Sequence, residues 1–259
     1  MEPSPSQSLA GQTAVVTGSS RGIGRAIVLE LARAGAAVLV HGAPGSQTAE
    51  ATAAEARALG AEATTVLADL EDCGQQDALF ERAWQWRSSV DIWVNNAGAD
   101  VLTGPAAAWP FEQKLETLWR VDVVAALRLA RLAGARMKQA GRGAILNIGW
   151  DGALRGMAGD SAQLFAAAKG AVAAFTLSLA QSLAPEVRVN CLAPGWIKTG
   201  WGRQASAYWR QHAEQESLLG RWGTPEDVAW VARFLLSPGA EFLNGQIIQV
   251  NGGFRIRRA

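Results

Sequence analysis

Short apolar runs alternate with longer segments of helical periodicity along most of the chain. The first run, TAVVT at 13–17, leads through a glycine cluster into IGRAIVLELARAG at 23–35. A short β-branched run predicts a buried strand, and apolar residues at three- and four-residue spacing predict a helix that Gly35 would end. This strand–turn–helix unit is the element from which we expect the fold to be assembled.

The same alternation continues toward the C-terminus. We expect further strands at 36–41, 61–68, 90–98, 144–148, 187–193 and 245–250, and helices at 48–59, 74–87, 111–137, 160–183 and 225–236. Strands joined by helices of this length imply right-handed crossovers and a parallel sheet covered on both faces. The pattern therefore predicts a single α/β domain, a doubly wound Rossmann-type sheet over 11–259, preceded by a flexible tail at 1–10.

One segment does not fit the alternation. Residues 200–222 are rich in tryptophan and polar side chains, without the apolar period of a core element. We expect this segment to be a lid or a substrate loop.

Composition and charge narrow the classes of partner. Of the 259 residues, 24 are Lys or Arg and 23 are Asp or Glu, so the net charge of +1 gives no broad basic surface for nucleic acid or an anionic membrane. Cys73, Cys191, His41 and His212 are too few and too scattered for a structural metal site. We expect both cysteines to be core thiols in a reducing compartment.

The N-terminal residues MEPSPSQSLA lack the positive charge and apolar run of a signal peptide. No later stretch reaches the length of uncharged apolar sequence that a membrane span needs. We therefore expect a cytoplasmic protein.

The glycine cluster carries the first candidate chemistry. TGSSRGIG at 17–24 follows a predicted strand and opens a predicted helix, so its backbone N–H groups and the helix N-terminus are placed to hold a pyrophosphate. In a parallel sheet this junction is where dinucleotides bind. The expected contacts come from Gly18, Ser20, Arg21, Gly22, Ile23 and Gly24.

This turn resembles the cofactor turn of the short-chain dehydrogenase/reductase family, of classical type: Thr-Gly, three residues, then Gly-x-Gly. Further motifs typical of that family follow in order, over residues 10–254: Asp69-Leu70, Asn95-Asn96-Ala97-Gly98, the segment Pro194 to Thr199, Asn244-Gly245-Gln246 and Asn251-Gly252-Gly253. The resemblance implies an NAD(P)-dependent oxidoreductase. It also implies cofactor contacts from Asp69 and Leu70 at the adenine, from Asn95, Ala97 and Gly98 after the fourth strand, and from Pro194, Gly195, Ile197 and Thr199 at the nicotinamide.

The choice between the two nicotinamide cofactors follows from charge. A carboxylate at the end of the second strand would bind the ribose 2′-hydroxyl of NAD and repel the 2′-phosphate of NADP. That position is Gly42, whereas Arg21 can offer a guanidinium to a phosphate, and Ser46 can add a donor. We expect NADPH to be preferred over NADH.

The catalytic positions depart from the family pattern. The family uses a Tyr hydroxyl as acid/base, a Lys four residues later that holds the nicotinamide ribose, a Ser, and an Asn on the long helix. The resemblance places Lys169 at the lysine, but Phe165 stands for the Tyr, Trp150 for the Ser and Asp122 for the Asn. Lys169 is the only charge in an apolar helix and therefore needs a partner.

The proton donor and the substrate pocket stay open at this point. The donor is water, the substrate itself or a neighbouring side chain. The candidate side chains are Asp151, directly after the fifth strand, and Tyr208 in the predicted lid; the alternatives are that Asp151 caps a turn and that Tyr208 only covers the pocket. Four tryptophans on segments bordering the pocket, with Phe165, could form a flat box for an aromatic or cationic substrate, or could be packing residues: Trp150, Trp196, Trp201 and Trp209.

Two functions fit these residues. The first is an NADPH-dependent reductase that transfers hydride to a C=N, C=O or activated C=C bond of a small molecule. The second is a cofactor-binding protein without redox turnover, in which Phe165 and Trp150 mark the loss of catalysis. The resemblance further implies a homodimer or homotetramer built through the two long helices and the last strand.

Overall fold

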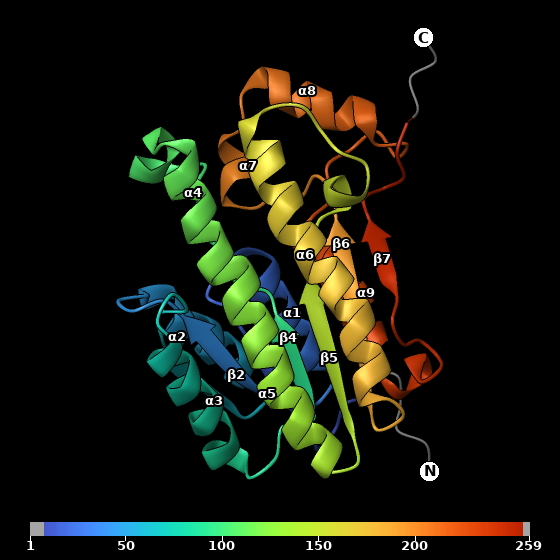
Figure 1. Cartoon of the computed structure of the whole chain (residues 1–259). Coiled ribbons are helices and arrows are strands. Elements are labelled where there is room, and N and C mark those ends of the chain that lie inside the picture. Colours follow the sequence, from blue (N-terminus) through green and yellow to red (C-terminus); the bar gives the residue numbers. More distant parts are fainter. Residues whose placement is uncertain (1–7, 256–259) are drawn as a thin grey trace.

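The computed structural model describes residues 8–255, and within them seven parallel strands form one sheet (Figure 1). The order across the sheet is β3-β2-β1-β4-β5-β6-β7. The strands are β1 Thr13–Val16, β2 Ala37–Gly42, β3 Ala63–Leu67, β4 Ile92–Asn95, β5 Gly143–Ile148, β6 Val187–Pro194 and β7 Ile247–Val250. The order reverses between β1 and β4, which makes the carboxyl ends of these two strands the expected place for a ligand.

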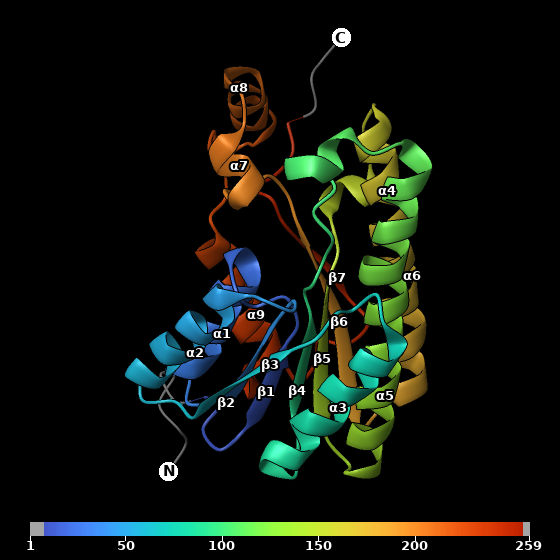
Figure 2. The same cartoon turned by 90° about the vertical axis from the view of Figure 1, so that its left-hand side faces the viewer.

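Helices cover both faces of this sheet (Figure 2). One layer contains α1 Gly22–Arg33, α2 Gln47–Ala58 and α9 Pro225–Leu236, and the other contains α3 Cys73–Arg87, α4 Phe111–Leu118, α5 Ala126–Gln139 and α6 Asp160–Leu183. Alternate residues of β1 pack in different cores. Ala14 and Val16 pack in the core that contains α1, whereas Val15 packs in the core that contains α5. Both faces of the sheet are therefore buried, and the predicted doubly wound α/β fold is confirmed.

The long helix expected at 111–137 is interrupted. Between α4 and α5 the chain forms a π-helical turn, Trp119–Ala125, which buries Asp122. A π turn inserts extra backbone without changing the apolar character of the helix, so the hydrophobic period did not reveal it.

Two further details differ from the sequence expectations. The segment at 200–222 contains helices α7 Gly200–Gln204 and α8 Ala207–Glu216, which lie beyond the carboxyl ends of the strands (Figure 1). Leu9, expected in a flexible tail, is fully buried, and its N–H donates to the carbonyl of Ala34.

By length and composition alone, α6 is apolar enough to cross a membrane. Its apolar character has another cause in this fold, because α6 packs against β5 and β6 and buries Leu164, Val172 and Leu179, among others.

A chain of buried side-chain hydrogen bonds crosses from the sheet to α6. Trp93 Nε1 donates to Asn95 Oδ1, Asn95 Nδ2 to Asn147 Oδ1, and Asn147 Nδ2 to Thr176 Oγ1, each at 2.9 Å. Thr176 Oγ1 in turn donates to the carbonyl of Val172. Every member is satisfied by the next, so the chain fixes the position of α6 over β4 and β5.

Replacing Thr176 with Val should therefore destabilise the protein. Thr176→Val keeps the shape but leaves the Asn147 amide without its acceptor, at a cost of about 1–3 kcal/mol in the free energy of unfolding. Ser182→Ala is the matched control, because Ser182 makes the same kind of bond along α6, to Ser178, but is exposed. Urea unfolding measures both; equal stabilities for the two variants would contradict the role of the buried chain.

Candidate cofactor and active site

The glycine-rich turn after β1 packs closely against the segment after β4. A Cβ on Gly18 would lie 2.6 Å from Ala97 Cα, and one on Gly24 would lie 2.4 Å from Asn96 Nδ2. Gly18 and Gly22 also have φ of +60° and +58°, which L side chains rarely adopt. Glycine is required at position 18 because two backbones approach each other closely there. A phosphate bound over the turn would also require the absence of side chains.

Side-chain hydrogen bonds lock the same two segments together. Thr17 Oγ1 accepts the N–H of Asn96 at 3.0 Å and that of Ala97 at 3.1 Å. Asn96 Nδ2 donates back to the carbonyls of Thr17 and Gly18. The predicted cofactor residues of both segments are thus brought together at one edge of the sheet.

Some predicted cofactor residues have side chains that are already engaged. The Asn95 side chain belongs to the buried chain that ends at Thr176, and Leu70 is packed in the core with β3 and α3. A ligand at this edge could meet these two residues through their backbone. Asp69 is exposed, with its carboxylate accepting the N–H of Glu71.

The segment after β6 approaches the glycine turn. β6 ends at Pro194, Ile197 bridges to Gly223, and Thr199 precedes α7. A Cβ on Gly22 would lie 3.7 Å from Thr199 Cγ2. The structure therefore places the predicted nicotinamide segment across from the predicted pyrophosphate turn.

The end of β2 has no room for a side chain. Gly42 is buried, and a Cβ there would lie 2.9 Å from Ala49 Cβ and 3.0 Å from Ser46 Oγ. The neutral Ser46 hydroxyl at the start of α2 thus occupies the place of a carboxylate. A helix N-terminus with a hydroxyl donor favours an anion.

Arg21 is exposed and directly precedes the first residue of α1, Gly22. Burial opposes ionisation of Asp100, but hydrogen bonds from Thr103 and from backbone N–H groups, together with the charge of Arg21, keep the pKa of Asp100 below its ordinary value. Arg21 is therefore close enough to the loop after β4 for its charge to be felt there.

Lys169 has a buried partner. Its Nζ lies 2.8 Å from Asp122 Oδ2, and the side chains are 11% and 1% exposed. The other oxygen, Oδ1, accepts the N–H of Ala99 at 2.8 Å, and a Cβ on Gly98 would come within 2.8 Å of Oδ2. The sequence required a partner for Lys169 and singled out Asp122, but it did not join the two, because the π turn that aims Asp122 at α6 was not foreseen.

The residues expected at the family's Tyr and Ser positions offer no hydroxyl. Phe165 packs against an apolar cluster of Val101, Leu118 and Leu164. The ring of Trp150 covers Gly152, whose missing Cβ would lie 2.2 Å from Trp150 Cζ2. Neither side chain can supply an acid.

Asp151 is buried and paired. Its Oδ2 accepts from Asn251 Nδ2 at 2.9 Å and from Arg155 at 2.5 Å, and the guanidinium of Arg155 lies over the ring of Phe254. Burial raises the pKa of Asp151, while Asn251 and the charge of Arg155 oppose the rise. The side chain is therefore held toward β7 and the C-terminal segment.

The aromatic side chains described at 196–222 pack mainly on one another. Trp196 lies 5.6 Å from Trp209 and 5.8 Å from Trp222 between ring centroids, and its Nε1 donates to Glu216 at 2.8 Å. Rings this close are in direct contact and leave no space for a flat ligand between them. Tyr208 is 66% exposed and stacks on His212. The side chain of Trp201 lies outside the described part of the structure.

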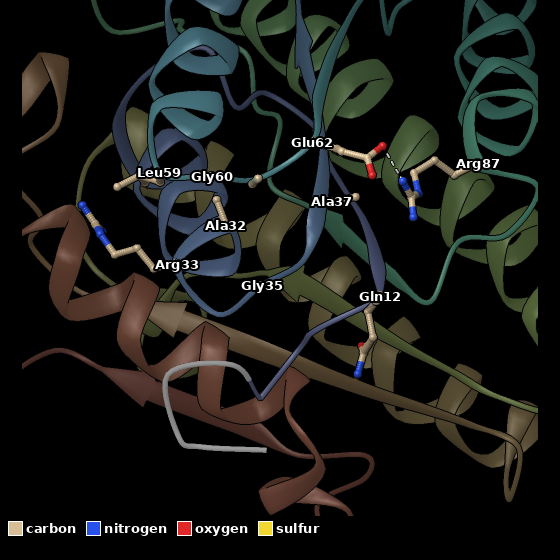
Figure 3. A pocket seen from close by; sticks show the side chains of 11 residues that line it. Gln12, Ala32, Arg33, Gly35, Ala37, Leu59, Gly60, Glu62 and Arg87 are labelled. Carbon is tan, nitrogen blue, oxygen red and sulfur yellow. Dashed lines mark hydrogen bonds and ion pairs between the residues drawn. The ribbon is translucent and has the colours of Figure 1, made fainter. Parts of the chain in front are cut away.

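A cavity of about 280 Å³ lies elsewhere, at the amino ends of β1 and β2 (Figure 3). Gln12, Gly35 and Ala37 line it, and Glu62 pairs with Arg87 beside it. Because it is at the opposite end of these strands from the glycine turn, it is not part of the candidate site. Among residues 8–255, no group of His, Cys, Asp or Glu side chains could hold a metal ion.

A seven-stranded parallel sheet with a glycine turn at its switch point defines the class of Rossmann-type dinucleotide-binding folds. The family model described as enoyl-(acyl carrier protein) reductase matches residues 18–255. The chain is 36% identical to 3-oxoacyl-[acyl-carrier-protein] reductase FabG of Aquifex aeolicus, over 95% of this chain and 98% of the relative. The chain belongs to the short-chain dehydrogenase/reductase family.

Solved structures agree with this assignment. A 7α-hydroxysteroid dehydrogenase in complex with NADH and 7-oxo glycochenodeoxycholic acid superposes with a TM-score of 0.88 at 30% identity, covering 98% of both chains. The angucycline C-6 ketoreductase LanV with bound NADP superposes with a TM-score of 0.85 at 33% identity, covering 95% of this chain and 96% of the other. Similar proteins thus bind either nicotinamide cofactor.

Removing one charge of the Lys169–Asp122 pair should lower the free energy of unfolding strongly, and removing both charges should lower it less. Lys169→Met leaves the Asp122 carboxylate buried without a cation, which costs about 3–5 kcal/mol in the free energy of unfolding. The double variant Lys169→Met with Asp122→Asn should recover most of this loss. Arg25→Met, which breaks the more exposed pair with Glu55, should change stability by at most about 1 kcal/mol.

Urea unfolding of the native protein and these three variants measures the loss and its recovery. Equal losses for Lys169→Met and Arg25→Met, with no recovery in the double variant, would mean that the buried pair is not formed in solution.

Proposed function

We propose that the protein is an NADPH-dependent reductase that transfers hydride to a C=N, C=O or activated C=C bond of an aromatic or cationic small molecule. The observation that carries the proposal is the buried pair of Lys169 and Asp122. A buried ion pair can often be replaced by apolar residues without loss of stability. A buried charge at this position is therefore better explained by a ligand than by folding.

The residues at the sheet edge fit a dinucleotide. The close-packed glycine turn leaves a cradle at the N-terminus of α1, and Gly42 with Ser46 leaves the end of β2 free of negative charge. NADPH supplies a hydride when it is bound. In the proposed site the turn would hold the pyrophosphate, Lys169 the nicotinamide ribose, and Asp122 would fix Lys169 in place.

The chemistry must proceed without the family tyrosine. General acid catalysis is worth about 10²–10⁴-fold in rate, so its loss slows hydride transfer without forbidding it. A protonated imine accepts hydride without a protein acid. The candidate donors for other substrates are Asp151, whose pKa burial raises, and Tyr208, which would reach the pocket only after lid closure.

The alternative is a cofactor-binding protein without turnover. It is favoured by Phe165, which packs into an apolar cluster and has no polar atom. The partners expected in either case are a small molecule and further copies of the chain, as a homodimer or homotetramer, in the cytoplasm. Neither nucleic acid nor a membrane is an expected partner.

Purified protein mixed with NADPH and a panel of ketones and cyclic imines tests the proposal through the absorbance of the reduced nicotinamide. We expect turnover on at least one aromatic or cationic imine. With that substrate, Asp151→Asn should lower turnover by about 10²-fold if Asp151 is the acid or a counter-ion, and Tyr208→Phe should change it little.

The opposite pattern, a silent Asp151→Asn and an inactive Tyr208→Phe, would assign the proton to the lid. Phe165→Tyr is the control that separates the two functions, because it restores the missing hydroxyl. Tight NADPH binding without turnover on any substrate, together with ketone reduction by Phe165→Tyr alone, would favour the protein without native turnover.

NADPH should bind more tightly than NADH. One charge-assisted contact of Arg21 with the 2′-phosphate is worth about 1.5–3 kcal/mol, or roughly 10–150-fold in the dissociation constant. Arg21→Ala should therefore weaken the binding of NADPH and leave the binding of NADH almost unchanged. Arg25→Ala, which removes the same charge one turn along α1, should alter neither; titration by tryptophan fluorescence measures all three proteins, and equal native affinities for both cofactors would refute the preference.

A further inference from the structure

His41 is a buried residue at the end of β2 whose ring joins two segments of the cofactor edge. The side chain is 3% exposed. Its Nδ1 accepts the N–H of Gly18 at 2.9 Å, and its Nε2 lies 3.1 Å from the carbonyl of Ala68. Gly18 belongs to the glycine turn after β1, and Ala68 directly precedes Asp69 after β3.

These partners define the protonation state of the ring. A backbone N–H can only donate and a carbonyl can only accept, so Nδ1 carries no proton and Nε2 carries one. Burial lowers the pKa of His41 to about 4, although the bond to Ala68 opposes this shift. The ring is therefore neutral near pH 7, with one acceptor and one donor pointing in opposite directions.

Backbone contacts hold His41 against the turn as well. Its N–H donates to Ser19 Oγ at 3.0 Å, and its carbonyl accepts the N–H of Ser19 at 2.9 Å. Ser19 Oγ donates onward to the carbonyl of Val16. β2 and the glycine turn thus form one unit. It meets the segment after β3 through the imidazole and through the carbonyl of Gly42, which accepts the N–H of Ala68 at 3.1 Å.

We propose that His41 is a positioning residue that fixes the spacing between the pyrophosphate turn and the adenosine-binding segment at Asp69. The proposal rests on the proposed NADPH site and adds a residue that touches no part of the cofactor. The N–H of Gly18 is occupied by the imidazole, so the pyrophosphate must be held by N–H groups later in the turn. The adenosine half of the cofactor should depend on His41, and the nicotinamide half should not.

Two conservative variants each remove one of the two hydrogen bonds of the ring. Asn places an amide oxygen near the position of Nδ1, so His41→Asn keeps the bond to Gly18 and loses the bond to Ala68. Gln places an amide nitrogen near the position of Nε2, so His41→Gln keeps the bond to Ala68 and loses the bond to Gly18. His41→Leu loses both.

The probe is adenosine 2′,5′-bisphosphate, with reduced nicotinamide mononucleotide as the second ligand. His41→Asn and His41→Gln should each weaken the binding of the bisphosphate by roughly 2–10-fold, as expected for the loss of one neutral hydrogen bond. His41→Leu should weaken this binding by more than either. The KM for NADPH should rise with little change in kcat, and the mononucleotide should bind as it does to the native protein. His212→Asn, the same substitution at the other histidine, is the control and should leave bisphosphate binding unchanged.

Circular dichroism at the assay temperature establishes that each variant is folded. Folded Asn and Gln variants that bind the bisphosphate as tightly as the native protein would overturn the role of His41, as would equal losses for both ligands. A native protein that binds neither NADPH nor the bisphosphate would overturn the proposed function itself.

Discussion

The ion pair between Lys169 and Asp122 ties together the elements around the candidate active site. Two charges removed from water are tolerated only when they face each other and their remaining lone pairs are satisfied. Asp122 meets this condition by taking Lys169 of α6 on one oxygen and the N–H of Ala99, in the loop after β4, on the other. The π turn before α5 carries Asp122 to this contact, and the absence of a Cβ at Gly98 leaves room for its carboxylate.

Other side chains hold the strand ends in the same manner. Thr17 and Asn96 join the loops after β1 and β4, and His41 joins the loop after β1 to the end of β3. Each of these bonds is between a buried or half-buried side chain and backbone, so the edge of the sheet is shaped before any ligand arrives. The predicted lid differs, because Trp196 and Trp209 form a separate small core with Trp222. We expect binding at the sheet edge to be preorganised and substrate selection to depend on movement of the lid.

Much of the fold could be predicted from the sequence because apolar period and turn residues are local signals. The bounds of α6, predicted as 160–183, agree with the structure, and the order of strands and helices is as expected. The π turn at Trp119–Ala125, the short helices of the lid and the burial of Leu9 were not predicted, since each depends on tertiary contacts. For the same reason the sequence identified Lys169 and Asp122 separately, and it gave no sign that His41 bridges two loops.

The central claim is that the buried lysine serves a bound nicotinamide cofactor while Asp122 holds it. A crystal structure of the protein with NADP⁺ tests this claim most directly. The account predicts that Lys169 Nζ donates to the nicotinamide ribose and keeps its contact with Asp122, with the pyrophosphate over the turn at 18–24. NADP⁺ bound at this edge with its ribose out of reach of Lys169 would contradict the account.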